Sequence, residues 1–272
     1  MSKLDAFLNA ARKAPQLMGV LNVTPDSFSD GGQYNSLDAA LAQAQALSEA
    51  GASCVDVGGE STRPDADPVS AEDELQRVAP ILQALSQTDA LISIDTYKSS
   101  VAEAAVRAGA ELINDVWGMT RSPDIAHVAA AHDAGVVITY NRGAADSSID
   151  IVADMQAFFD RQIGHAEAAG VSSERILLDP GIGFGKTWQQ NYQVMAAIDK
   201  LHAYGCVLLI GVSRKSFIGH LTGAPVSERL PGTLAAGLMA LNAGAQVLRV
   251  HDVSEHKQAI DVWRACQSGL PQ

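Results

Sequence analysis

The sequence is poor in cysteine, in aromatic residues and in charge. Its three cysteines, Cys54, Cys206 and Cys266, are odd in number, far apart, and form no CxxC pair. These spacings exclude a disulfide-stapled domain and predict reduced thiols in a cytosolic protein. Aromatic residues make up 5% and charged residues 18% of the 272 residues, whereas 47% are hydrophobic. That balance excludes a disordered chain and is typical of closely packed α/β layers.

Long apolar runs and an excess of basic charge are absent as well. No apolar stretch approaches the roughly 18 residues of a membrane span, and the N-terminal MSKLDAFLNAARK lacks the features of a signal peptide. The formal net charge of -12 leaves no diffuse positive field to attract nucleic acid or an anionic membrane. We therefore expect a cytoplasmic protein without nucleic-acid or membrane partners, in which local cations hold any anionic substrate.

Several common catalytic motifs are missing. The seven histidines form no HExxH or HxH metal pattern, and no cysteine lies at zinc spacing from them. The segment 211–215 departs from the GxSxG nucleophile elbow because it ends in Lys215. The glycine-rich stretch Asp179–Thr187 fails the phosphate-loop pattern, since Pro180 occupies a required glycine position. Zinc chemistry and serine hydrolysis are therefore unsupported.

What the sequence does contain is eight short apolar runs, each followed by a segment with helical periodicity. The runs are Leu17–Asn22, Ser53–Val57, Leu91–Asp95, Glu111–Asp115, Val136–Tyr140, Ile176–Asp179, Val207–Val212 and Gln246–Val250. The helical segments include Leu37–Ala50, Val101–Ala108 and Leu234–Asn242. Strict alternation predicts a parallel sheet buried on both faces, and the number eight favours closure into a barrel.

Domain organisation follows from the same pattern. No linker, internal repeat or charge block divides the chain. We therefore expect an α/β protein with a single (β/α)8 TIM barrel over residues 1–272, in which residues 1–15 are an N-terminal extension. Glycines that end helices before the next strand predict left-handed C-caps. They are Gly51, Gly109, Gly135, Gly205 and Gly244.

Nearly every apolar run ends in residues that can hydrogen-bond or bind a metal. These are Asn22, Glu60–Arg63, Asp95, Asn114 with Asp115, Tyr140 with Asn141, Asp179, Ser213–Ser216, and Arg249 with His251. In a (β/α)8 barrel the C-terminal strand ends converge on the face that carries the active site. One polar strand end would be ordinary helix capping. Eight together indicate an enzyme.

The first strand ends suggest particular ligands. The Asn22 side chain offers one hard oxygen for Mg²⁺, and the long loop after it is suited to close over a substrate. Thr62 and Arg63 follow a glycine-rich turn and can bind phosphate or carboxylate, although Arg63 could equally be a solvated charge. Asp95 and Asn114 should face a ligand with complementary donors. For Asp95, helix capping remains an alternative.

The later strand ends suggest a flat ring and an anion. Asp179 can accept two parallel hydrogen bonds from an N–C–NH2 edge, and Phe184 is available to stack on a flat ring. Basic residues follow the seventh and eighth strands, in Ser213–Ser216 and Arg249–Asp252. This is the common phosphate site of such barrels, beside helix N-termini. A solvated surface charge is the alternative for each cation, and it stays open for Arg214.

The chain resembles the dihydropteroate synthases, a family of pterin-binding (β/α)8 barrels. The matching segments, in family order, are GVLNVTPDSFSDGG, DVGGESTRP, ISID, LINDVWG, ILLDPGIGFGK, GVSRKSFIG and LRVHDV. The resemblance implies a homodimeric transferase of folate biosynthesis that is a target of sulfonamides. It would condense 6-hydroxymethyl-7,8-dihydropterin pyrophosphate with p-aminobenzoate, giving 7,8-dihydropteroate and pyrophosphate with the help of Mg²⁺.

The resemblance also implies a role for each matching residue. The residues expected at the pterin are Asp95, Asn114, Asp179, Phe184, Gly211 and Lys215. Those expected at the pyrophosphate are Asn22, which would also bind Mg²⁺, with Thr62, Arg249 and His251. Those expected at p-aminobenzoate are Phe28, Thr62, Arg63, Pro64, Lys215 and Ser216. The expected catalytic residues are Asp95, Lys215 and Arg63. No protein nucleophile is required, because positioning and charge stabilisation suffice for this chemistry.

The sequence departs from the family at one wall. After the fifth strand the family often has a Met-His pair, whereas Thr139 and Tyr140 occupy those positions here.

Three other interpretations of the function remain. One is a corrinoid-dependent methyltransferase of the same fold, which p-aminobenzoate dependence would exclude. Another is a Schiff-base aldolase using Lys215, which borohydride trapping would detect. The third is an inactive relative that binds pterin without turnover.

Overall fold

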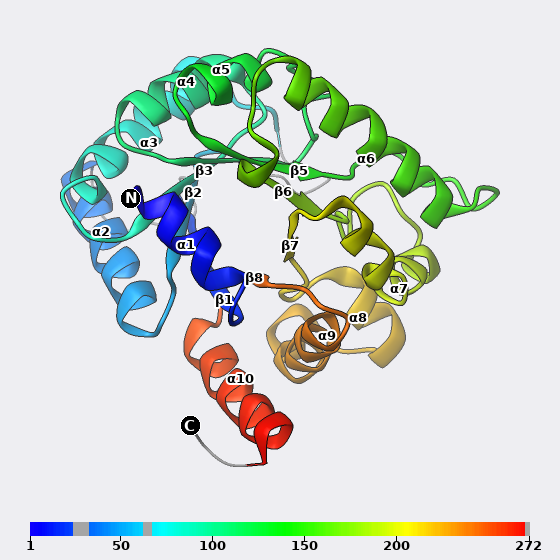
Figure 1. The fold of residues 1–272 in the computed structure, drawn as a ribbon. Helices are drawn as coiled ribbons and strands as arrows, with labels where there is room; N and C mark the ends of the chain where they lie inside the picture. Colours follow the sequence, from blue (N-terminus) through cyan, green and yellow to red (C-terminus); the bar gives the residue numbers. More distant parts are fainter. Residues whose placement is uncertain (24–32, 62–66, 270–272) are drawn as a thin grey trace.

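The structure is a computed structural model, and it describes residues 1–23, 33–61 and 67–269. Eight parallel strands pair in sequence order and close into a barrel, surrounded by helices (Figure 1). The strands are β1 Gln16–Asn22, β2 Cys54–Gly58, β3 Leu91–Asp95, β4 Leu112–Asp115, β5 Gly135–Thr139, β6 Ile176–Asp179, β7 Val207–Ile210 and β8 Val247–Val250. The predicted (β/α)8 barrel is confirmed.

Helix α1 Lys3–Ala11 precedes the first strand, and the other helices follow strands and cover the outside of the barrel. They are α2 Gln33–Glu49, α3 Ala71–Leu85, α4 Ser99–Arg107, α5 Ile125–Ala131, α6 Ile151–Ala168, α7 Trp188–Met195, α8 Ser216–Thr222, α9 Leu230–Asn242 and α10 Val253–Ser268. Short 3-10 turns are η2 Ser173–Arg175, η3 Ile198–Tyr204 and η4 Val226–Glu228. No described helix combines the length and apolar character that a bilayer crossing needs.

The two faces of the strands belong to two separate apolar clusters. Outward-facing side chains such as Val55, Ile94 and Ile113 pack against the surrounding helices. Inward-facing side chains at the N-terminal strand ends form a second cluster. Its strand members are Met18, Cys54, Leu91, Leu112, Val137, Leu177, Val207, Leu209 and Val247. This division is the period-two alternation expected of a sheet that is covered on both sides.

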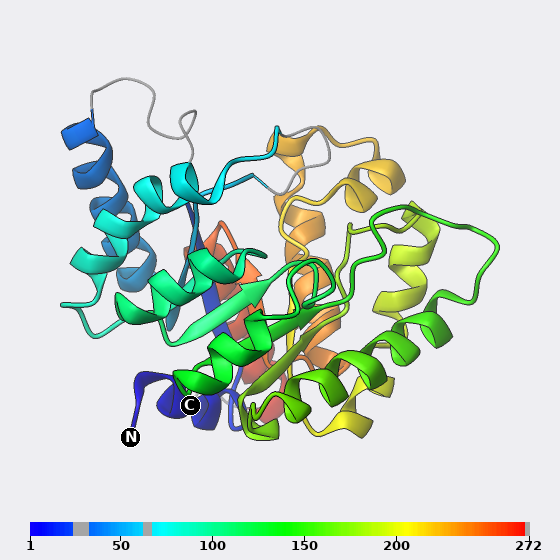
Figure 2. The ribbon, with the colours of Figure 1, turned by 90° about the horizontal axis from the view of Figure 1, so that it is seen from above.

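Helix α1 closes the N-terminal end of the barrel (Figure 2). A capping box between Ser2 and Asp5 starts the helix. Its buried face consists of Leu4, Phe7, Leu8 and Ala11, which join the inward-facing cluster. The residues before the first strand therefore pack against the N-terminal end of the barrel and cover it.

This packing predicts that Phe7→Ala lowers the free energy of unfolding by about 3–5 kcal/mol, the usual cost of emptying a large buried site. Phe7 is 4% exposed. The polar mouth lies at the other end of the strands, so any activity at low temperature should be little affected. Urea denaturation would measure the effect, with the exposed Lys13→Ala as control. A loss no larger than the control's would contradict the role of α1.

The glycine prediction is confirmed at four positions and wrong at one. Gly51, Gly109, Gly205 and Gly244 have positive φ. Gly135 instead lies within β5, and the left-handed residue is Asp133, with φ 53°. Gly135 is needed for space, because a Cβ atom there would lie 2.9 Å from Leu112 Cδ1 and 3.0 Å from Leu4 Cδ2. It makes room for α1 under the barrel.

Candidate active site

The inward-facing positions become polar toward the C-terminal strand ends. Register pairs Asp56 with Ser93, Asp95 with Asn114, and Thr139 with Asp179. Paired residues on parallel strands point to the same side of a sheet. Beyond the N-terminal ends of the strands, the polar inward positions in the described residues are Asn22, Asp56, Ser93, Asp95, Asn114, Thr139, Asp179 and Arg249. The predicted convergence of strand-end side chains at one mouth is therefore present.

One guanidinium bridges two buried carboxylates in this mouth. Arg249 Nε donates to Asp56 Oδ2 at 2.6 Å, and Nη2 donates to Asp95 Oδ2 at 2.5 Å. Asn114 Nδ2 also donates to Asp56 Oδ2, at 2.9 Å. The second oxygens of Asp56 and Asp95 are buried and have no hydrogen-bond partner among the described residues. Buried acceptors without donors are rare, so these oxygens are candidates for ligand contact.

The titration of Asp95 reflects this burial. Burial raises the pKa of Asp95, whereas Arg249 lowers it and the neighbouring Asp56 raises it further.

The alternative in which Asp95 caps the next helix is wrong. The residue at the N-cap of α4 is Lys98, and the cap has no side-chain hydrogen bond.

Asp179, Gly211 and Lys215 surround a second part of the mouth. Asp179 Oδ1 accepts from the Gly181 N–H at 2.7 Å. A Cβ atom at Gly211 would lie 3.8 Å from both Asp179 Oδ2 and Lys215 Nζ. The missing side chain thus leaves space between a carboxylate and an ammonium group. Burial raises the pKa of Asp179 while Lys215 lowers it. Burial lowers the pKa of Lys215 to about 8 while Asp179 raises it.

Phe184 lies beside this space. Lys215 Nζ is 4.5 Å from the centroid of the Phe184 ring, and it donates to the carbonyl oxygen of Ile182. The structure therefore brings together the side chains of Asp179, Phe184 and Lys215 next to Gly211.

Asn22 lies at the rim, beside Asp95. A Cβ atom at Gly58 would lie 3.7 Å from Asn22 Oδ1 and 3.5 Å from Asp95 Cβ, and Asn22 itself is exposed. In the described part of the chain, no group of three or more histidine, cysteine or acidic residues could hold a metal ion. A Mg²⁺ ion at Asn22 would thus take most of its ligands from substrate and water, as Mg²⁺ commonly does.

The loops after β7 and β8 meet through a serine and a histidine. His251 Nδ1 lies 2.9 Å from Ser213 Oγ, and the His251 N–H donates to the same oxygen at 3.3 Å. Arg214 is left-handed, with φ 56°, and its Nε donates to Asp252 at 3.0 Å. Its side chain is 42% exposed. For Arg214 the surface-charge interpretation is therefore the better one.

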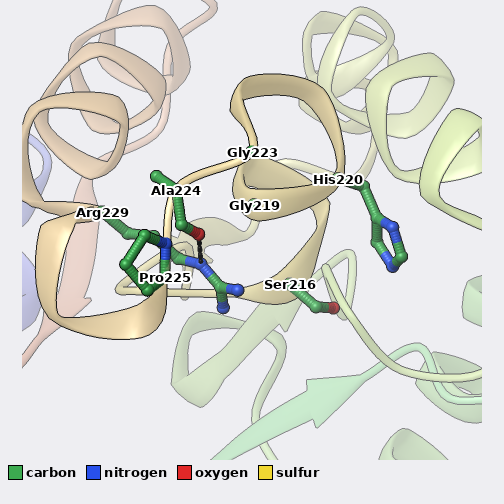
Figure 3. Close-up of a pocket in the computed structure, with 7 residues that line it drawn as sticks. All are labelled: Ser216, Gly219, His220, Gly223, Ala224, Pro225 and Arg229. Atoms are coloured by element: carbon green, nitrogen blue, oxygen red, sulfur yellow. Dashed lines mark hydrogen bonds between the residues drawn. The ribbon is translucent and has the colours of Figure 1, made fainter.

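Ser216 begins α8 and borders a separate pocket of about 350 Å³. Figure 3 shows it between α8 and the segment that follows, with the Arg229 Nε donating to the Ala224 carbonyl at 3.1 Å. Of the predicted site residues that the structure describes, only Ser216 lines this pocket. Phe28, Thr62, Arg63 and Pro64 lie outside the described residues.

Of the two residues that replace the family's Met-His pair after β5, only Thr139 faces the mouth. Thr139 faces the mouth beside Asp179 and is 1% exposed. Tyr140 is fully buried among the helices, where its ring centroid lies 5.2 Å from that of Phe158. Its hydroxyl donates to Asp154 Oδ2 at 2.5 Å. Tyr140 therefore belongs to the packing behind the strand.

Two residues of the site were missed by the sequence reasoning. Asp56 lies inside the buried strand β2 rather than at its end. An acid within an otherwise apolar strand needs a partner, and this signal could have identified it. Lys186, at the end of the loop after β6, donates to three backbone carbonyls. No local pattern distinguishes it from a solvated lysine.

Known proteins resemble the chain over most of its length. The profile of the family described as "Pterin binding enzyme" matches residues 18–251. A dihydropteroate synthase of Synechocystis sp. is 44% identical over 264 residues, covering 93% of this chain and 91% of that protein. Two solved dihydropteroate synthases share the fold. One, from Clostridium difficile in the presence of pteroic acid, has a TM-score of 0.90 at 42% identity and covers 93% of this chain and 97% of its own. The other, from Xanthomonas albilineans with 4-aminobenzoic acid, has a TM-score of 0.89 at 44% identity and covers 94% of each chain.

Proposed function

The chain belongs to the dihydropteroate synthase family of pterin-binding enzymes, and from this premise we propose that it is a transferase that makes 7,8-dihydropteroate. It would join 6-hydroxymethyl-7,8-dihydropterin pyrophosphate to p-aminobenzoate and release pyrophosphate. The observation that carries the proposal is the space at Gly211 between Asp179 and Lys215. Its opposed charges suit a flat ring that has donors on one edge and a carbonyl on another.

The pterin would lie in this space. Asp179 Oδ2 is the acceptor for the N–C–NH2 edge, because Oδ1 already accepts from the Gly181 N–H. Lys215 can donate to the ring carbonyl, and Phe184 can contact the ring face. Asp95 and Asn114 would reach the remaining ring nitrogens from β3 and β4. These roles are proposals that the arrangement of the side chains supports.

The pyrophosphate would lie above Arg249. A guanidinium has five N–H donors, and Arg249 uses two of them on Asp56 and Asp95. It can therefore neutralise the carboxylates and contact a phosphate at the same time. His251 and Thr62 are the further proposed phosphate contacts. Asn22 would hold Mg²⁺, and the ion would supply positive charge to neutralise the departing pyrophosphate.

The chain's own residues would act through charge and position. As pyrophosphate leaves, Asp95 and Asp179 favour positive charge on the pterin methylene, and Arg249 stabilises the leaving group. The amine of p-aminobenzoate then attacks the methylene carbon, and the amine proton passes to solvent. The proposed p-aminobenzoate contacts are Phe28, Thr62, Arg63, Pro64, Lys215 and Ser216. No covalent enzyme intermediate is involved.

The deciding experiment is pyrophosphate release from the dihydropterin pyrophosphate with Mg²⁺, with and without p-aminobenzoate. Release that requires the amine establishes the proposed reaction. Pterin binding without release would defeat it and favour the methyltransferase or the inactive relative. Borohydride trapping tests the aldolase, because reduction would fix a Schiff base formed at Lys215.

The pH profile should report Lys215. The proposed role needs the protonated amine, whose folded-state pKa is about 8. We therefore expect kcat/KM for the pterin substrate to be high below pH 8 and to fall above it. Steady-state rates between pH 6 and 10 would show this fall. In Lys215→Arg the fall should occur at higher pH, and kcat/KM should be lower than in the parent protein. An unchanged decline in Lys215→Arg would assign it to another group.

Other expectations stay predictions. These are the homodimer, the cytoplasmic location, the sulfonamide sensitivity and the action of residues 1–272 as a single domain. Sedimentation, fractionation and inhibition assays would test them separately from the reaction.

A further inference from the structure

The loop between β6 and α7 contains three left-handed glycines. Gly181, Gly183 and Gly185 have φ of 64°, 88° and 55°, a region that other residues rarely adopt. A Cβ atom at Gly181 would lie 1.9 Å from the Tyr140 carbonyl oxygen, and one at Gly185 would lie 2.8 Å from the Gly143 nitrogen. The glycines therefore allow this loop to pack directly on the backbone of the loop after β5.

The ammonium group of Lys186 lies where the two loops meet. Its Nζ donates to the carbonyl oxygens of Gly181 at 2.8 Å, Phe184 at 3.0 Å and Tyr140 at 3.1 Å. Three donors thus meet three acceptors. Nζ also lies 4.2 Å from the centroid of the Tyr140 ring, a favourable cation–π distance. This one charge closes the turn 181–186 and ties it to the neighbouring loop.

The same turn carries one group of the proposed pterin site and contacts another. Phe184 is one of them, and its carbonyl is held by Lys186. The other is Lys215, which donates to the Ile182 carbonyl and contacts the Phe184 ring. A shift of the turn would therefore move the ring and the ammonium group together.

Packing alone does not account for Lys186. Burial lowers its pKa well below the ordinary value, while Asp179 raises it, Lys215 and Arg142 lower it, and Asp154 raises it. None of these carboxylates forms an ion pair with it in the described residues. A cation that is kept in a poorly solvated place by carbonyls costs folding free energy, and such costs cluster at functional sites.

We propose that Lys186 is a positioning residue for the pterin: it fixes the turn 181–186 so that Phe184 and Lys215 meet the ring in the correct geometry. The inference rests on the proposed function only in placing the pterin beside Asp179 and Gly211. Lys186 touches backbone carbonyls and contacts no reacting atom. Its removal should therefore weaken pterin binding selectively.

The test compares Lys186→Met, Lys186→Arg and a control, Lys200→Met, which removes an exposed lysine from η3. Binding of 6-hydroxymethylpterin, followed by its own fluorescence, gives a Kd without turnover. We expect Lys186→Met to raise this Kd, and the KM for the pterin substrate, by about tenfold or more. The KM for p-aminobenzoate should rise less than that for the pterin, because its expected contacts other than Lys215 lie outside the turn 181–186. Lys186→Arg keeps the positive charge but not the geometry of the three hydrogen bonds. Its pterin Kd should lie between those of the parent protein and Lys186→Met.

The outcomes separate the inference from the function. If Lys186→Met folds with a lower Tm but an unchanged pterin Kd, Lys186 is structural and the inference is overturned. If that variant does not fold, Lys186→Arg decides: a raised Kd supports the inference, and an unchanged one overturns it. Parent protein that binds pterin yet releases no pyrophosphate would defeat the proposed reaction, while the Kd comparison would still stand.

Discussion

Asp179→Asn should weaken pterin binding by about 100- to 1,000-fold, or about 3–4 kcal/mol, the range for a buried charged hydrogen-bond partner. Asparagine keeps the oxygen that accepts from the Gly181 N–H. It replaces the other oxygen with an amide that donates. A pterin edge that offers two donors would then meet one acceptor and one donor. The fluorescence Kd of 6-hydroxymethylpterin measures the loss without requiring turnover.

The same substitution should leave the fold intact or stabilise it. Burial raises the pKa of Asp179 above its unfolded value, so ionising this group at neutral pH costs folding free energy. Asparagine removes the cost, and the Tm should equal or exceed that of the parent. Asp150→Asn is a matched control, because it makes the same chemical change at an exposed cap that asparagine also serves. A large fall in Tm for Asp179→Asn would show that the carboxylate is structural.

The fold could be predicted because its signals are local. Short apolar runs that alternate with segments of helical periodicity identify strands without knowledge of their neighbours. Most of the strand boundaries that shifted moved by one residue, and the larger shift follows Ile210, where β7 ends ahead of the left-handed Arg214. Gly135 was misjudged because its neighbour in space is Leu4 of α1. That contact is invisible in the local pattern.

The site could be predicted only in part, for the same reason. Strand-end residues such as Asp95 and Asp179 reach the mouth because every strand of a barrel ends on the same face. Asp56 was missed because its partner Arg249 is 193 residues away. The pairing depends on the closed barrel, in which β8 lies beside β1. Arg249 was predicted as a phosphate contact alone, but it also neutralises two buried acids.

That second role makes Arg249→Met the most disruptive substitution we expect. Asp56 and the Asp95 side chain are almost fully buried, and Arg249 is the cation that bridges them. Removing one partner of a buried ion pair leaves uncompensated charge and costs about 3–5 kcal/mol of stability. Pyrophosphate release should be lost as well. Urea denaturation at neutral pH and the release assay would measure the two effects separately.

A second substitution separates the two roles of Arg249. Asp56→Asn in the Arg249→Met background removes one of the two unpaired charges, so part of the lost stability should return. Activity should not return, because the phosphate contact is still missing. If the double variant is no more stable than Arg249→Met, the destabilisation comes from lost packing of the arginine stem rather than from charge. If activity returns with stability, Arg249 acts on the reaction only by keeping the acids neutralised, and the pyrophosphate must be held by other groups.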